Sequence, residues 1–124
     1  MGGRGSMMNP ARDRVPEYKT VKMIDGVKVL ERLDRKLMPN LPIMSNTPNT
    51  GYMLTDKDGN FEQFRTYNKN REPALDIDYD NIDGIKKLHA HDWVNGKRTG
   101  GHRDLTAQEI KKYGGLLRAT NVNI

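Results

Sequence analysis

The chain has 124 residues, of which 35% are hydrophobic and 6% aromatic, enough for the small core of one domain. It contains no cysteine, which excludes a disulfide scaffold and a thiolate zinc site and fits a reducing compartment. No apolar run is long enough to span a membrane, so we expect a soluble protein. The net charge of +5 favours phosphate-bearing partners such as RNA, and solubility alone explains it equally well.

The first half of the chain contains β-rich runs separated by turn residues. Residues 1–17 carry glycine, proline and arginine without periodicity, which is typical of a disordered leader. An Asp25-Gly26 pair between two β-rich runs then predicts a hairpin. Residues 36–50 contain three prolines and predict an irregular connection. A second hairpin is expected where YMLT and FEQFRTY flank the turn residues 56–60.

Two runs, residues 74–80 and 88–94, show the alternation of side chains that is typical of strands. In the first run, one face is apolar and the other carries Asp76, Asp78 and Asp80. In the second run, one face is formed by His89, His91 and Trp93. Pairing of the runs through an Asp83-Gly84 turn, with both apolar faces inward, would place imidazoles and carboxylates together on a solvent-exposed face.

The most specific prediction concerns the two histidines of the second run. We predict that His89 and His91 both project to solvent and that at least one reaches a carboxylate of Asp76, Asp78 or Asp80. Such a carboxylate is expected to raise the histidine pKa. An ordinary solvated strand face is the alternative interpretation of this pattern.

Paired imidazoles beside carboxylates suit the metal-free cleavage of RNA, for which no cofactor is expected. His89 and His91 are the candidate base and acid, and Asp76 or Asp78 would fix an imidazole tautomer. The candidate phosphate-binding and base-stacking residues are Tyr79, Trp93, Lys97, Arg98, His102 and Arg103. A zinc or iron site formed by Asp78, His89 and His91 is the alternative chemistry.

The C-terminal helix has a clear start. Thr106 and Glu109 have the spacing of a capping box, and Gly114-Gly115 is expected to end the helix after Tyr113. Residues 119–124 are expected to be a frayed tail. The predicted fold over residues 18–118 is therefore one α+β domain: a mainly antiparallel meander sheet of four to six strands, with one C-terminal helix packed on it.

The chain resembles uncharacterised domains encoded by phages and prophages of bacteria in five runs: LPIMSNTPNT, YMLTDKDGNFEQFRTY, ALDIDYD, LHAHDW and LTAQEI. Many of these domains are assigned to a ribonuclease-like superfamily that gathers barnase, EndoU, the colicin ribonucleases and RelE. The resemblance implies a four-stranded antiparallel sheet with helices on one face, and toxin-like RNA cleavage by His89 and His91 with Arg98 or Arg103 as phosphate ligand. It also implies RNA and an immunity or phage-particle protein as partners, and a cytoplasmic or phage-associated location. A non-catalytic phage accessory module remains the alternative.

Overall fold

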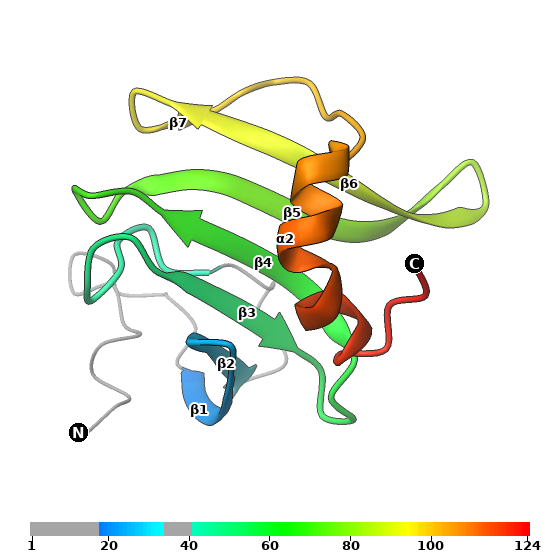
Figure 1. The fold of residues 1–124 in the computed structure, drawn as a ribbon, viewed down its shortest axis with the longest axis horizontal. Coiled ribbons are helices and arrows are strands. Elements are labelled where there is room, and N and C mark those ends of the chain that lie inside the picture. Colours follow the sequence, from blue (N-terminus) through cyan, green and yellow to red (C-terminus); the bar gives the residue numbers. More distant parts are fainter. Residues whose placement is uncertain (1–17, 34–40) are drawn as a thin grey trace.

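The computed structural model describes residues 18–33 and 41–124, which form one seven-stranded sheet and one described helix (Figure 1). The elements, in chain order, are β1 (Tyr18–Ile24), β2 (Val27–Arg32), β3 (Gly51–Thr55), β4 (Phe61–Tyr67), β5 (Pro73–Ile82), β6 (Ile85–Val94), β7 (Lys97–Arg98) and α2 (Ala107–Arg118). The strands lie in sequence order, and all neighbours are antiparallel except β2 and β3, which are parallel. The α+β class is confirmed, but the sheet has seven strands rather than four to six.

Three hairpins turn at an Asp-Gly or Asn-Gly pair. Both central residues have positive φ at Asp25-Gly26, Asp83-Gly84 and Asn95-Gly96. This conformation matches the twist of paired strands, and glycine and asparagine adopt it readily. The first two turns were predicted. The third was not predicted as a hairpin turn: it reverses the chain from β6 into β7, which adds a strand to the sheet.

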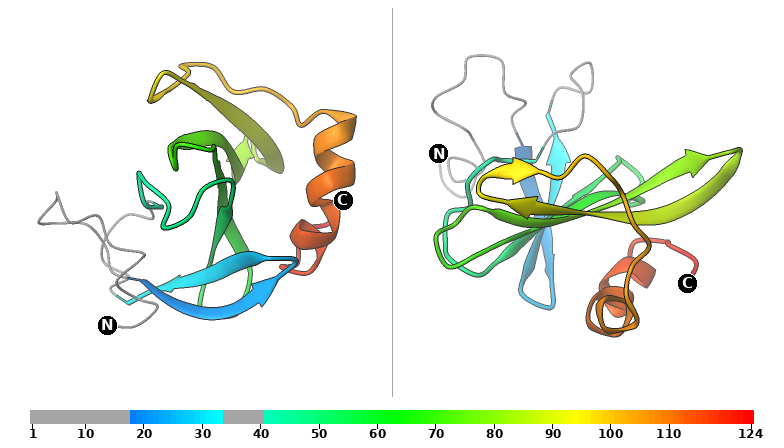
Figure 2. Two further views of the ribbon diagram at one scale, coloured as in Figure 1. Left: turned by 60° about the vertical axis from the view of Figure 1, so that its left-hand side comes forward. Right: turned by 90° about the horizontal axis from the view of Figure 1, so that it is seen from above.

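One face of the sheet packs against α2, and we call it the helix face (Figure 2). Its buried core is entirely apolar and consists of Val29, Met53, Phe61, Phe64, Leu75, Ile77, Ala90, Leu116, Leu117 and Val122. Because side chains alternate along a strand, every second residue of the central strands is directed into this core. The predicted packing of the C-terminal helix on the sheet is therefore confirmed.

The start of α2 is the predicted capping box. The backbone N–H of Glu109 donates to the Thr106 hydroxyl, and the backbone N–H of Thr106 donates to the Glu109 carboxylate. These two bonds satisfy N–H groups that have no partner inside a helix.

The end of α2 differs from the prediction. The helix continues through Gly114-Gly115 to Arg118 instead of stopping after Tyr113. Two glycines cost a helix about 1 kcal/mol each, whereas burying a leucine side chain gains about 1.5–3 kcal/mol. Since Leu116 and Leu117 are both buried in the core, tertiary packing outweighs the local glycine signal.

The residues after α2 are partly packed. Thr120 and Val122 are only 1% and 3% exposed, and the Phe61 backbone N–H donates to the Thr120 carbonyl. The prediction of a frayed tail is therefore wrong for these residues. The predicted leader, residues 1–17, lies outside the described residues. No helix within 18–33 or 41–124 is long and apolar enough to cross a membrane.

The opposite face of the sheet, which we call the second face, is covered in part. Its apolar cluster consists of Tyr18, Leu30, Leu41, Tyr52, Leu54 and Tyr67. Residues 41–50, the irregular connection, lie over part of it. The Arg65 guanidinium donates to the carbonyls of Leu41 and Pro42, and the Tyr67 hydroxyl also donates to the Pro42 carbonyl. Polar residues of this face are therefore placed in a mostly enclosed environment.

Candidate functional site

The pairing of β5 with β6 brings the candidate carboxylates and imidazoles together. Asp78 lies opposite His89, and Asp76 lies opposite His91. All four side chains are on the second face, because the residues between them, including Ala90, are buried in the helix-face core. The predicted hairpin, its turn and its shared polar face are therefore confirmed.

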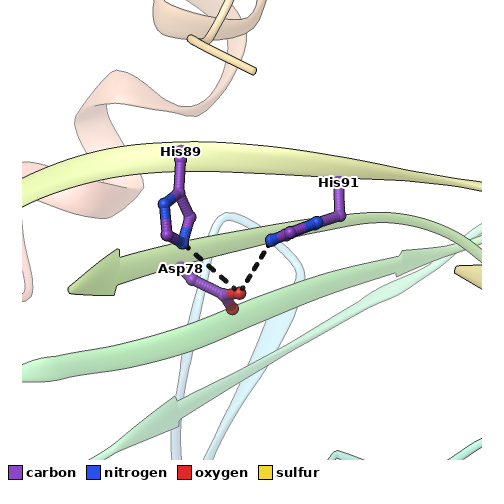
Figure 3. Close-up of side chains that lie close together, drawn as sticks. All are labelled: Asp78, His89 and His91. Atoms are coloured by element: carbon purple, nitrogen blue, oxygen red, sulfur yellow. Dashed lines mark ion pairs between the residues drawn. The ribbon is translucent and has the colours of Figure 1, made fainter. Parts of the chain in front are cut away.

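Asp78, His89 and His91 form a compact group, which we call the triad (Figure 3). The Nε2 atoms of both imidazoles lie 3.7 Å from the same Asp78 oxygen, Oδ2. His89 Nε2 is also 3.2 Å from Asp80 Oδ2, but this ion-pair contact lacks the geometry of a hydrogen bond. One ligand atom from each triad residue lies within 4.8 Å of the others, so the three side chains converge on one point.

The triad is more enclosed than the sequence predicted. His89 is only 7% exposed, so the expectation that both histidines project to solvent is wrong. Both ring nitrogens of His89 and Nδ1 of His91 are buried without a hydrogen-bond partner among the described residues. An unsatisfied buried polar atom is uncommon and expensive, so these nitrogens call for an explanation.

The electrostatics of His91 also differ from the expectation. Its pKa is lowered, first because burial disfavours the imidazolium and second because the Arg98 guanidinium repels it. The Asp78 carboxylate acts in the opposite direction but does not prevail. The predicted rise in histidine pKa is therefore wrong for His91, and this imidazole is neutral at pH 7.

His102 joins the two other histidines from a different part of the chain. Its ring centroid is 4.9 Å from that of His89 and 6.0 Å from that of His91. His102 itself is exposed, so it lies at the rim of the triad. All three histidines of the chain are thus gathered at one place.

Asp76 belongs to a separate ion pair. Its carboxylate, which is fully buried, accepts hydrogen bonds from Nε and Nη2 of Arg65 at 2.6 and 3.0 Å. The Arg65 guanidinium also lies 4.9 Å from the Trp93 ring centroid, so the indole has a packing role and is only half-exposed. Asp76 was expected to fix an imidazole tautomer and Trp93 to stack on a base, but both contact Arg65. Arg65 was not predicted as a partner of these residues, because β4 mixes apolar and polar side chains on both faces and gives no clear signal.

Most of the predicted phosphate ligands either form ion pairs within the protein or lie away from the triad. Arg98, on β7, forms ion pairs with Asp76 and Asp78, and so contacts the triad directly. The Arg103 guanidinium, in contrast, bonds the carboxylates of Asp92 and Glu109.

Two further candidates lie apart from the triad. Tyr79 packs against the helix-face core, with its ring 6.5 Å from that of Phe61, so it does not share a face with the histidines. Lys97 is exposed at the start of β7. Of the predicted phosphate and base ligands, Arg98 and His102 are therefore the two that the fold brings to the triad.

A groove of about 690 Å³ lies next to the triad and shares Asp78 with it. Asp80 and Arg98 also line this groove. Among the described residues its charged lining consists of Asp56, Glu62, Asp78, Asp80, Lys86 and Arg98. Carboxylates outnumber cationic groups, so the groove repels a polyanion and attracts a cation.

Comparison of the chain with protein-family models, with curated proteins and with solved structures gave no match.

Proposed function

We propose that the protein binds a divalent transition-metal ion through Asp78, His89 and His91. The observation that supports this most directly is the convergence of two imidazole nitrogens and a carboxylate oxygen within 4.8 Å, with buried imidazole nitrogens that lack partners. A bound cation would satisfy His89 Nε2, a buried nitrogen that faces Asp78 and has no hydrogen-bond partner among the described residues.

The donor set and the protonation state suit such an ion. Zinc and neighbouring first-row metals take imidazole nitrogen together with carboxylate oxygen. Metal binding requires neutral imidazole, and burial together with Arg98 lowers the pKa of His91, so that this ring is neutral at pH 7. The excess of carboxylates in the adjoining groove further favours a cation.

Arg98 competes for the same carboxylate. Its guanidinium donates to Asp78 Oδ2, the oxygen that faces both imidazoles. A metal ion therefore has to displace Arg98 from this oxygen or use the other oxygen of the carboxyl group. Because Arg98 is 37% exposed on a short strand, its side chain has room to move away.

Zinc titration of the chelator-treated, dialysed protein tests the proposal. We expect one ion per chain by calorimetry, and at about 100-fold excess over Kd a stabilisation of about 2.7 kcal/mol, hence a Tm rise of roughly 10 °C or more. Asp78→Asn and His91→Gln should remove both effects. Asp58→Asn, an exposed carboxylate on the turn before β4, is the matched control and should retain them. Absence of stoichiometric binding of zinc, cobalt and nickel at pH 7.5 would rule out the proposal.

Metal-independent RNA cleavage is the second candidate. It is favoured by the pairing of two imidazoles with the Arg98 guanidinium, and by the neutral state of His91, which suits a general base. The resemblance to phage-borne ribonuclease-like domains supports the same activity, and RNA and immunity partners belong to this candidate. The carboxylate-rich groove argues against it.

Incubation of the purified protein with total RNA, with and without EDTA, separates the candidates. Cleavage that survives EDTA and disappears in His91→Gln supports the second candidate. Cleavage that EDTA abolishes supports a metal-dependent nuclease, and the absence of cleavage leaves metal binding as the function.

A further inference from the structure

We infer that His102 is a fourth ligand of the proposed metal ion, so that three imidazoles and the Asp78 carboxylate form a closed site. This inference rests on the proposed metal binding and adds to it the coordination number and the role of the metal. It is carried by the backbone register that brings residues 99–103 beside β6, and by the distances between the three imidazole rings.

The register places His102 on the correct face. Arg103 and Ala90 exchange two backbone hydrogen bonds, of 2.7 and 2.9 Å, as an antiparallel bridge. The residue before Arg103 therefore lies opposite the residue after Ala90, which is His91. Because Ala90 is directed toward the helix-face core, alternation directs His102 toward the second face, where the triad lies.

The ring distances place His102 beside the triad and nearest to His89, while the ligand atoms that already converge within 4.8 Å are those of Asp78, His89 and His91. The three imidazole centroids are separated by 4.9 Å (His89–His102), 5.2 Å (His89–His91) and 6.0 Å (His91–His102). They therefore form a triangle around a small volume, with Asp78 facing two of its corners. Since His102 is exposed, its side chain can turn toward that volume without displacing packed neighbours.

The segment that carries His102 is held firmly on one side and is adaptable on the other. The Arg103 guanidinium forms hydrogen bonds with the carboxylates of both Asp92 and Glu109, which attaches the segment to β6 and to α2. Gly100 and Gly101, on the other side, have open space where a side chain would begin. The imidazole of His102 is thus fixed near the triad, while the glycines allow the small adjustment that coordination requires.

The number of protein ligands indicates whether a metal ion is structural or catalytic. Catalytic zinc sites keep an open position for water or substrate, whereas closed sites with four protein ligands are structural. With His102 bound, the ion joins β5, β6 and the segment after β7, and no position is left for an activated water. The inferred role is therefore to fasten the segment after β7 to β5 and β6, and not to hydrolyse a substrate.

Asp80 is the competing fourth ligand, because its Oδ2 lies 3.2 Å from His89 Nε2. Its side chain is 62% exposed and it is the last carboxylate before the hairpin tip, so it is less restrained than the ring of His102. Asp80→Asn therefore serves as the matched control for His102→Gln. Both side chains are exposed, so both variants are expected to fold.

The experiment measures zinc affinity by competition with a chromogenic chelator, and the visible spectrum of the cobalt-loaded full chain. We expect His102→Gln to weaken zinc by about 100-fold or more, since even residues outside the ligand shell change metal affinity 10–100-fold. The wild-type cobalt spectrum should show the intense bands of four-coordination, and His102→Gln should show the weaker bands of a higher, water-containing coordination. Asp80→Asn removes a groove charge but no inferred ligand, so it should weaken zinc far less than His102→Gln and should keep the wild-type cobalt spectrum.

The outcomes separate this inference from the proposed function. A wild-type protein that binds no metal overturns both. A wild-type protein that binds one ion, with His102→Gln equal to it in affinity and spectrum, overturns the fourth ligand and leaves the triad intact. Loss of binding in Asp80→Asn, with retention in His102→Gln, also overturns the inference.

Discussion

Two charged clusters lie next to each other on the second face, and they differ in whether their polar atoms have partners. In the first, the Asp76 carboxylate accepts two hydrogen bonds from Arg65, whose remaining nitrogen donates to the backbone of residues 41–42. In the second, the triad, three imidazole nitrogens of His89 and His91 are buried without partners among the described residues. Both clusters come from paired strands of the same sheet and share the same enclosed environment.

The difference separates a structural role from a binding role. A buried ion pair whose hydrogen bonds are complete is costly to break, since removal of one member leaves an uncompensated charge. Buried nitrogens without partners lower stability by about 1–3 kcal/mol each unless a ligand satisfies them. The first cluster therefore stabilises the fold by itself, whereas the second contains a buried nitrogen, His89 Nε2, that a ligand at the triad would satisfy. The following changes test this contrast.

The largest effect is expected at Arg65. Arg65→Met leaves the Asp76 carboxylate buried without its main partner, so we expect a loss of about 3–5 kcal/mol in the free energy of unfolding, measured by urea denaturation. Arg65→Met combined with Asp76→Leu removes both charges and should regain most of this loss. A single variant within about 1 kcal/mol of the wild type would show that the pair has no structural role.

At His89 we expect a substitution to raise the free energy of unfolding rather than lower it. In metal-free protein, His89→Leu removes two buried nitrogens that lack partners, so the free energy of unfolding should rise by about 1–2 kcal/mol. The same variant should lose the stabilisation that zinc gives the wild type. Urea denaturation with and without zinc measures both effects. A destabilisation as large as that of Arg65→Met would remove the distinction between the two clusters.

Arg98 contacts both clusters, so its replacement tests how the two clusters differ in metal binding. Arg98→Gln removes a cation that forms ion pairs with Asp76 and Asp78, so zinc affinity should rise by about tenfold, which corresponds to about 1.4 kcal/mol. Lys97→Gln, which removes the neighbouring exposed cation of β7, is the control for net charge alone and should change affinity less. Under the RNA-cleavage candidate, Arg98→Gln would instead abolish activity, so the two functions predict opposite results.

The smallest effect concerns the exposed ion pairs of Arg103. Hydrogen bonds from its guanidinium lower the pKa values of Asp92 and Glu109. Their contribution to stability is therefore present above the ordinary pKa of each carboxyl group, and it is lost as the pH falls through the lowered values. Since these groups are partly exposed, we expect no more than about 1 kcal/mol per pair. Tm measured between pH 7 and pH 2.5 should fall less steeply for Arg103→Gln than for the wild type, and identical curves would contradict this account.

Local patterns predicted the elements that local chemistry determines. The alternation of residues 74–80 and 88–94, together with Asp83-Gly84, predicted the hairpin and the face that Asp78 shares with His89 and His91. The capping box at Thr106 predicted the start of α2. In both cases the interacting groups are close in sequence, so their spacing carries the structural information.

Long-range contacts account for the errors. The enclosure of the second face depends on residues 41–50 folding back onto Arg65, and nothing in their proline-rich composition indicates that position. The continuation of α2 through Gly114-Gly115 depends on where Leu117 packs, which is a property of the assembled core. The Asn95-Gly96 turn is different, because an Asn-Gly pair is itself a hairpin signal and this one was not used to predict a further strand.

The parallel pairing of β2 with β3 has a consequence for the order of folding. Strands β3 to β7 are neighbours joined by short turns, so each pairing closes only a short loop. The β1–β2 hairpin has to dock across the whole connection between Arg32 and Gly51, which is a slower, less local event. We therefore expect amide hydrogens at the β2–β3 junction to exchange through a lower-energy opening than those between β4 and β5. The N-terminal hairpin would then be the last part of the sheet to assemble and the first to detach.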